Sequence, residues 1–188
     1  MDRANIVIIG GGVVGCAVAR AVSRQWENVF LLEQMPRLGM ASSSRNSGVI
    51  HSGVYYPLGS LKARTCLEGN RLTYQFCAAH NVPHRRTGKL VVVATPEEER
   101  ELEALRQRGA ANGVEGLQII DRAALRAREP RIAGCAALEI SSTGIVASEE
   151  LVKAYARVAS EQGAHILDRK STRLNSSHIQ KSRMPSSA

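Results

Sequence analysis

The stretch Asn5-Ile6-Val7-Ile8-Ile9-Gly10-Gly11-Gly12-Val13-Val14-Gly15 decides the fold of this chain. Its apolar first half predicts a buried parallel strand, and its glycines have the G-x-G-x-x-G spacing of dinucleotide-binding turns. An Ala- and Val-rich helix is expected over residues 16–23, and a second strand over residues 29–32 ends at Glu33. A lone glycine motif is weak, but here strand, turn, helix, strand and acid follow in the required order. These residues therefore predict a Rossmann-like unit that holds a dinucleotide.

Each part of this unit has a physical role in dinucleotide binding. Gly10 permits the tight turn out of the strand, and Gly12 lacks a Cβ, so a pyrophosphate can approach the backbone. Gly15 lets the helix lie close to the strand. The helix N-terminus offers free N–H groups and the positive end of its dipole to the phosphates. Glu33 is placed to accept hydrogen bonds from both ribose hydroxyls.

The last segment of the chain, residues 168–188, is interpreted differently. Its sequence, DRKSTRLNSSHIQKSRMPSSA, has no apolar period, no strand pattern and no helix caps. A common sequencing-library adapter translates as DRKSTRLNSSH, and its other arm gives SRMPSSA, with the variable index falling at residues 179–181. We therefore interpret 168–188 as a non-native, disordered tail translated from an adapter, and we expect the natural gene to continue beyond Leu167.

Composition narrows the classes of function. The chain has 25 Lys and Arg and 17 Asp and Glu, a net charge of +8. Five basic residues and one acidic residue lie in the tail, which leaves a net charge of +4 for residues 1–167. This mild charge, without a basic run interleaved with aromatic residues, fits an anionic cofactor or small substrate better than nucleic acid. Four cysteines without C-x-x-C spacing predict reduced packing residues and no metal site.

The sequence also bears on location. No apolar run is long enough to span a bilayer, and the N-terminus has neither the basic region nor the cleavage site of a signal peptide. We therefore expect a cytoplasmic protein without a transmembrane segment. A peripheral contact with the inner membrane stays open.

The rest of the chain has an α/β pattern. Helices are expected at about residues 60–80, 95–111, 121–129 and 148–161, and strands at about 88–94, 117–120, 137–140 and 163–167. Ser60 and Asp121 are expected N-caps, and residues 95–98, Thr-Pro-Glu-Glu, have the cap, proline and capping-box glutamate of a sharp helix start. The apolar side of the helix after Ser60 is expected to carry Leu61, Leu67, Leu72 and Phe76.

A long Gly- and Ser-rich loop over residues 34–59 carries the next signal. Residues 41–56 read ASSSRNSGVIHSGVYY. Small hydroxylated residues and glycines can place N–H groups against a phosphate or a flavin ring, while Arg45 can bind an anion and Asn46 can hydrogen-bond a ring edge. Residues 49–56 are too apolar and aromatic for a solvated loop. The loop is therefore predicted to belong to a binding site.

At these residues the chain resembles a known family. The glycine fingerprint, RNSGVIHSGVYYPLGSLKARTCLEGNRL at 45–72, HNVPHRRTGKLVVVAT at 80–95 and SSTGIV at 141–146 are similar to the L-2-hydroxyglutarate dehydrogenase/oxidase group. This group belongs to the D-amino-acid-oxidase-like FAD-dependent oxidoreductases. The resemblance covers residues 4–167, and it is weaker to FAD-dependent glycerol-3-phosphate dehydrogenases. Residues 44–46, Ser-Arg-Asn, stand where hydroxyglutarate enzymes often have Gly-His-Asn, which bears on the substrate and not on the cofactor.

The resemblance implies an α/β fold in which a Rossmann-like FAD-binding domain with a parallel sheet is interleaved with part of an α+β substrate domain. The FAD-binding domain would use residues 1–81 and 147–167, and the substrate domain residues 82–146. The residues implied to hold FAD are Gly10, Gly12, Gly15, Glu33, Ser43, Arg45, Asn46, Ser47, Gly48 and Val49.

The implied reaction is oxidation of a small 2-hydroxy acid to the 2-oxo acid, with hydride transfer to flavin and oxygen or a quinone as electron acceptor. His51 is a candidate for the base or for a flavin contact, and Tyr56 is a candidate pocket residue. Lys62, with Arg64, is a candidate anchor for substrate carboxylates. Each has a structural alternative, such as a histidine that fixes the loop or a solvated surface cation. Because this group uses residues from the second half of a longer chain, the chain as written is expected to bind FAD poorly and to have no turnover.

Alternative functions stay open beside this one. The chain could belong to an FAD enzyme acting on glycerol 3-phosphate, an amino acid or an amine. A dicarboxylate substrate needs two cationic anchors, which distinguishes the hydroxy acid from these. A non-catalytic dinucleotide-binding or sensor module would hold its cofactor with residues 1–167 alone. A Rossmann NAD enzyme is the remaining rival, against which the loop at 42–53 argues.

Overall fold

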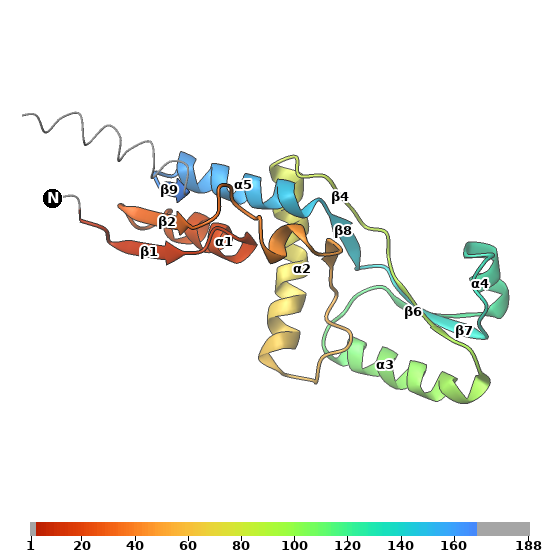
Figure 1. The fold of residues 1–188 in the computed structure, drawn as a ribbon. Helices are drawn as coiled ribbons and strands as arrows, with labels where there is room; N and C mark the ends of the chain where they lie inside the picture. Colours follow the sequence, from red (N-terminus) through yellow and green to blue (C-terminus); the bar gives the residue numbers. More distant parts are fainter. Residues whose placement is uncertain (1–2, 169–188) are drawn as a thin grey trace, which may run out of the picture. The chain divides into compact units, whose positions relative to one another are not determined.

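The structure, a computed structural model, describes residues 3–168 and divides into two units. The first unit comprises the chain up to residue 46 together with the chain from residue 147 onward, and the second unit comprises residues 47–146. Figure 1 labels the α-helices and most of the strands of both. The division into an FAD-binding domain and a substrate domain at residues 81/82 and 146/147 stays a prediction.

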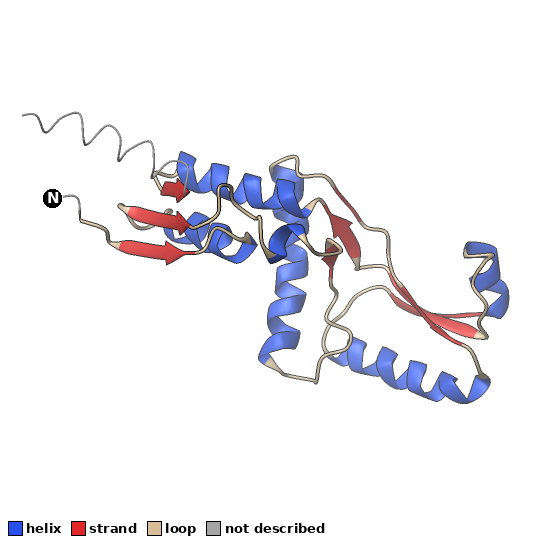
Figure 2. Cartoon of the chain, viewed as in Figure 1, coloured by secondary structure: helices blue, strands red, loops and turns tan. Residues whose placement is uncertain are grey.

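The first unit is a parallel sheet whose core is formed with two helices (Figure 2). Its elements are β1 (Ile6–Ile9), α1 (Val13–Val22), β2 (Val29–Glu33), the 3-10 helix η1 (Ser42–Ser44), α5 (Ser148–Glu161) and β9 (His165–Asp168). The strand order is β1-β2-β9, and both pairings are parallel. The expected strand–helix–strand unit is therefore present. Helix α1 begins at Val13 rather than at Cys16, because Gly12 already takes the extended N-cap conformation.

One side of this sheet faces the core, as the alternation along β1 shows. Ile6 and Ile8 pack against a cluster that includes Cys16, Leu31 and Val152, whereas Val7 and Ile9 are 51% and 87% exposed. Successive side chains of a strand point to opposite faces. Helices α1 and α5 therefore cover one face of the sheet, and within residues 3–168 the other face carries exposed apolar side chains.

The second unit contains two antiparallel sheets and three α-helices. The first sheet has the order β3-β8-β4 and the second the order β5-β7-β6. The elements are β3 (Val49–Ile50), α2 (Leu61–Ala79), β4 (His84–Arg85), β5 (Leu90–Val93), the 3-10 helix η2 (Pro96–Glu98), α3 (Glu99–Ala111), β6 (Leu117–Asp121), α4 (Arg122–Arg128), β7 (Ala136–Ile140) and β8 (Gly144–Val146). Leu138 and Ile140 of the central strand β7 are fully buried in its core.

The predicted helix starts are confirmed at atomic level. The Oγ of Ser60 accepts a hydrogen bond from the N–H of Ala63 at 3.1 Å, and Oδ1 of Asp121 accepts one from the N–H of Ala124 at 2.8 Å. The capping box at residues 95–98 is formed in both directions, and it begins with the 3-10 turn η2 before α3. A side-chain cap of this kind contributes about 1 kcal/mol to a helix.

Other expectations need correction. Strands β3, β4 and β8 were not expected, and the apolar side of α2 was predicted wrongly in part: Leu61 and Leu72 are 68% and 46% exposed. The buried residues of α2 are Ala63, Asn70, Tyr74, Phe76 and Cys77. Strand β9 includes Asp168, one residue beyond the predicted natural sequence. The remainder of the predicted adapter tail, 169–188, lies outside the described residues.

Candidate functional site

The glycine turn between β1 and α1 has the geometry that its sequence predicts. Gly10 has a φ of +102°, a conformation that favours glycine, and its N–H donates to the carbonyl of Leu32 at 2.8 Å. A Cβ at Gly15 would collide with the carbonyl oxygen of Gly10. A Cβ at Gly12 would lie 3.1 Å from Oγ of Ser43, and one at Gly10 would have no atom within 4 Å. The turn thus packs tightly against the helix and stays open in front of Gly10.

Glu33 connects the end of β2 to this turn. Its Oε2 accepts a hydrogen bond from the N–H of Gly11 at 2.7 Å, and its Oε1 accepts one from the N–H of Met35 at 2.8 Å. Hydrogen bonds to an ionised carboxylate are the strong ones. Because each carboxylate oxygen has a second lone pair, Glu33 fixes the turn and keeps acceptor capacity for a hydroxyl ligand.

Ser43 and Asn46 bring the loop after β2 to the same end of α1. The Oγ of Ser43 accepts a hydrogen bond from the N–H of Val13 at 2.9 Å. The Nδ2 of Asn46 donates to the carbonyls of Ser42 and Ser43 at 3.2 and 2.7 Å, and its Oδ1 accepts from Oγ of Ser148 at 2.8 Å. The structure therefore assembles the predicted Gly10, Gly12, Gly15, Glu33, Ser43 and Asn46 within one unit.

The surroundings of this turn suit an anion. The first turn of α1 carries no acidic residue, so its N–H groups and dipole are not offset there. Arg45, the C-cap of η1, is exposed to solvent and lies two residues after Ser43 in the sequence. Burial, and to a lesser extent the charge of Glu33, raises the pKa of the Cys16 thiol to about 11, so this cysteine is neutral. A pyrophosphate group thus fits the residues present.

The second unit holds the remaining predicted residues. Ser47 begins this unit, Gly48 has a φ of +65° and accepts a hydrogen bond from the N–H of Val146 at 2.8 Å, and Val49 pairs with Ile145. These residues lead into the segment that carries His51.

His51 and Tyr56 line one small pocket. The pocket is lined by His51, Ser52, Gly53, Val54, Tyr55, Tyr56, Lys89 and Thr143. Lys62 is outside this lining, but its Nζ lies 4.6 Å from the centre of the Tyr56 ring. Lys89, which sequence reasoning missed, places its Nζ 4.3 Å from the centre of the Tyr55 ring. Each tyrosine of the pair therefore has a cation against its face.

Asn70 is a second residue that sequence reasoning missed. It is 9% exposed on α2, and its Nδ2 donates to the carbonyls of His51 and Ser142 at 2.9 and 3.0 Å. The Sγ of Cys66 also contacts the His51 carbonyl oxygen, at 3.6 Å. An asparagine inside an otherwise apolar helix side was the available signal. Asn70 holds the main chain of His51 in place, while the His51 side chain is exposed.

Within residues 3–168, no group of three or more His, Cys, Asp or Glu side chains is arranged to hold a metal ion. In the same part of the chain, every helix is too short or too polar to cross a membrane.

Comparison with known proteins places these features in context. Residues 5–183 match the family model described as DAO, FAD dependent oxidoreductase. The match ends inside the segment interpreted as an adapter, whose origin stays a prediction. The chain is 39% identical over 168 residues to the mitochondrial L-2-hydroxyglutarate dehydrogenase of Caenorhabditis elegans, covering 88% of this chain and 39% of that protein. The corresponding enzyme of Nematostella vectensis is 42% identical over 156 residues, covering 82% and 34%.

Solved structures give a consistent result. The L-alpha-glycerophosphate oxidase of Mycoplasma pneumoniae with FAD bound aligns with a TM-score of 0.83 and 29% identity, covering 89% of this chain and 45% of that one. Glycine oxidase from Geobacillus kaustophilus, 22% identical with a TM-score of 0.76 over 89% of this chain and 47% of that one, shares the fold. The chain spans only between about a third and two fifths of the length of the two curated relatives described above.

Proposed function

Because the chain belongs to the DAO family of FAD-dependent oxidoreductases, we propose that it forms the N-terminal part of an enzyme that oxidises an L-2-hydroxyglutarate-like hydroxy acid to the 2-oxo acid. The family and its cofactor, FAD, are those predicted from the sequence, and both predictions are confirmed. The observation that carries the proposal is the 39% identity to L-2-hydroxyglutarate dehydrogenases over a segment that includes the His51 pocket.

The proposed FAD site begins at the glycine turn. Gly10, Gly12 and Gly15 would let the pyrophosphate approach the N-terminus of α1, and Glu33 would accept hydrogen bonds from ribose hydroxyls. Support comes from the open space in front of Gly10 and from the fixed carboxylate of Glu33. The loop from Ser43 through Arg45, Asn46, Ser47 and Gly48 to Val49 is proposed to continue along the cofactor. Bound FAD supplies the hydride acceptor of the reaction.

His51 is the proposed general base. A base must reach the substrate hydroxyl with a free ring nitrogen. The His51 side chain is exposed and has no hydrogen-bond partner within residues 3–168, while Asn70 fixes its main chain. The imidazole is thus positioned by its backbone and is available to take the hydroxyl proton. Tyr56, in the same pocket, would form part of the wall against the substrate.

Cationic side chains near the pocket are proposed to bind the substrate carboxylates. A dicarboxylate needs two anchors, and a lysine binds a carboxylate as a point charge. Lys62 lies against the Tyr56 ring, Lys89 lines the pocket, and Arg64 lies on the first turn of α2 after Lys62. Lys62 and Lys89 are the pair that the contacts with pocket tyrosines favour.

The chain as written is proposed to bind FAD poorly and to lack turnover. Parallel sheets are normally covered on both faces. In the first unit, the face that carries Val7 and Ile9 is exposed, and β1 is the outer strand of the sheet. The proposal is that further chain completes this layer. Oxygen or a quinone as electron acceptor, and a cytoplasmic location with a peripheral membrane contact, stay predictions; the relatives are named mitochondrial.

The test uses the full-length gene recovered from the source DNA. The purified protein is expected to be yellow, and its flavin absorbance near ~450 nm is expected to bleach anaerobically with L-2-hydroxyglutarate. Glycerol 3-phosphate is the second candidate substrate, because the glycerophosphate oxidase aligns over 89% of this chain. If glycerol 3-phosphate bleaches the flavin and L-2-hydroxyglutarate does not, glycerol 3-phosphate would replace the hydroxy acid as the proposed substrate. A colourless protein would contradict the FAD site itself.

A further inference from the structure

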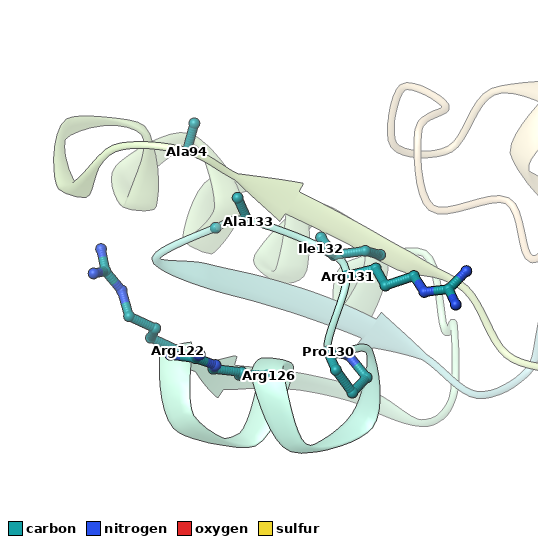
Figure 3. A pocket seen from close by; sticks show the side chains of 8 residues that line it. Ala94, Arg122, Arg126, Pro130, Arg131, Ile132 and Ala133 are labelled. Carbon is teal, nitrogen blue, oxygen red and sulfur yellow. The ribbon is translucent and has the colours of Figure 1, made fainter.

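A pocket of about 430 Å³ lies in the second unit and shares no lining residue with the His51 pocket. Its lining comes from the end of β5, from α4 and from the loop between α4 and β7 (Figure 3). We call it the arginine pocket; it is lined by Ala94, Arg122, Arg126, Pro130, Arg131, Ile132, Ala133 and Gly134. All of its lining residues belong to one unit, so its geometry is set by the fold of that unit.

The charge of the arginine pocket has one sign. Three of its lining residues are arginines, and none is acidic. Within residues 3–168, no ion pair involves Arg122, Arg126 or Arg131, whereas the neighbouring Arg128 pairs with Glu139. Guanidinium groups bind phosphate bidentately through parallel N–H groups. An anion in the pocket would offset the repulsion between these like charges.

The three arginines of the pocket come from two parts of the chain, α4 and the loop that follows it. Arg122 and Arg126 are one turn apart on α4, and therefore lie on the same side of the helix. Arg122 extends toward the end of β5 that carries Ala94, while Arg131 leaves the loop in a different direction (Figure 3). We therefore assign the primary contacts to Arg122 and Arg126, with Arg131 at the rim.

The backbone of the loop adds neutral donors. The N–H groups of Ala133 and Gly134 have no hydrogen-bond acceptor within residues 3–168. Gly134 cannot carry a side chain, because a Cβ there would collide with Cγ1 of Val92 and lie 3.0 Å from Cδ2 of Leu125. Gly134 thus lies close to β5, and two residues of the pocket lining, Ala133 and Gly134, have free N–H groups in the described part of the chain. Backbone N–H groups of this kind are a usual component of phosphate sites.

The size of the pocket and the apolar part of its lining indicate a ligand larger than an inorganic ion. About 430 Å³ falls in the range of small-molecule sites. Ala94, Pro130 and the 39% exposed Ile132 supply apolar surface next to the charges. We propose that the arginine pocket binds a small organic phosphate, with its phosphate on Arg122 and Arg126 and its organic part against Pro130 and Ile132.

The test is an NMR titration of the ¹⁵N-labelled 188-residue chain with phenyl phosphate, and with inorganic phosphate as the matched anion. Phenyl phosphate is expected to shift the amide signals of Ala133 and Gly134 saturably. Arg122→Gln and Arg126→Gln are each expected to weaken binding about tenfold, because a charge-assisted contact is lost. Arg100→Gln, an exposed arginine on α3 outside the pocket, is the control and is expected to bind as the unchanged chain does.

The outcomes separate a site from general charge attraction. Weaker binding of inorganic phosphate than of phenyl phosphate would support the apolar part of the site. Absence of saturable shifts, equal weakening by Arg100→Gln, or equal affinity for the two anions would each overturn the proposal. The readout needs neither FAD nor turnover, so it is independent of the proposed function.

Discussion

Replacing Gly15 by alanine is expected to destabilise the first unit, whereas the same replacement at Gly69 is expected to stabilise the second. Both glycines lie inside helices, α1 and α2, where alanine is normally favoured by about 1 kcal/mol. A Cβ at Gly15 would collide with the carbonyl oxygen of Gly10 and lie 3.4 Å from Cδ1 of Leu31. A Cβ at Gly69 would have no atom within 4 Å. The two sites therefore differ in contact and not in helix propensity.

The magnitude follows from what must move. To make room for the methyl group, α1 has to shift away from the turn, and the fully buried Cys16 and Ala19 move with it. Overpacking of this kind costs about 1–3 kcal/mol, and the collision with backbone places Gly15→Ala near the upper end. Because the higher helix propensity of alanine offsets about 1 kcal/mol of this cost, we expect the free energy of unfolding to fall by about 2 kcal/mol. For Gly69→Ala we expect a gain of about 0.5–1 kcal/mol.

Urea unfolding of the 188-residue chain measures both changes. The single tryptophan, Trp26, lies in the first unit and reports its unfolding by fluorescence, while far-ultraviolet circular dichroism reports both units. A Gly15→Ala midpoint equal to or above that of the unchanged chain would refute the close approach of α1 to the turn. Destabilisation by Gly69→Ala would show instead that alanine is unfavourable in these helices for a reason other than contact.

The remaining predictions concern single side chains. Glu33→Gln is expected to weaken FAD binding by the full-length protein about tenfold, since a charged acceptor is lost, and flavin fluorescence quenching measures this; an unchanged Kd would remove Glu33 from the site. Asn70→Ala is expected to lower the free energy of unfolding by about 2 kcal/mol, because two carbonyls lose a buried donor; urea midpoints within error of each other would contradict it. Burial raises the pKa of Cys16 and Cys77 to about 11 from an ordinary 9.0. The stability that these neutral thiols contribute is therefore complete below pH 9 and is lost as the pH rises to about 11. The urea midpoint is expected to fall over that range, and to fall less in the Cys16→Ala/Cys77→Ala variant. Parallel pH profiles of the urea midpoint for the two proteins would refute this.

Elements with local determinants could be predicted from the sequence. The caps at Ser60 and Asp121, and the capping box at residues 95–98, depend on contacts within four residues, so their helices were predicted correctly. Strands β3 and β4 have two residues each and exist through pairing with β8, at Val49↔Ile145 and His84↔Val146. Two-residue strands show no period, so only the assembled chain reveals them.

In the candidate site, too, the sequence predicts the features with local determinants and misses those that depend on distant contacts. The glycine spacing and the acid after β2 identified Gly10 and Glu33, because the motif states their roles in sequence order. The hydrogen bond from Gly11 to Glu33 and the contact of Asn70 with His51 join residues about twenty positions apart. Lys89 contacts Tyr55 across a longer gap in the sequence. Such partners depend on tertiary packing. An asparagine on an otherwise apolar helix side draws attention to Asn70, but its partner His51 cannot be identified from the sequence, and no local pattern indicates the contact of Lys89.

The pairing of β2 with β9 has a consequence for how the protein is made. Glu33 is placed opposite Asp168, so the entire second unit is synthesised between the two strands. A ribosome therefore exposes β1, α1 and β2 well before their last partner strand exists, whereas the second unit emerges as one continuous stretch. Contacts between such distant segments form slowly. The first unit is accordingly the part that stays incomplete longest during synthesis, and slower translation after residue 146 would prolong that interval.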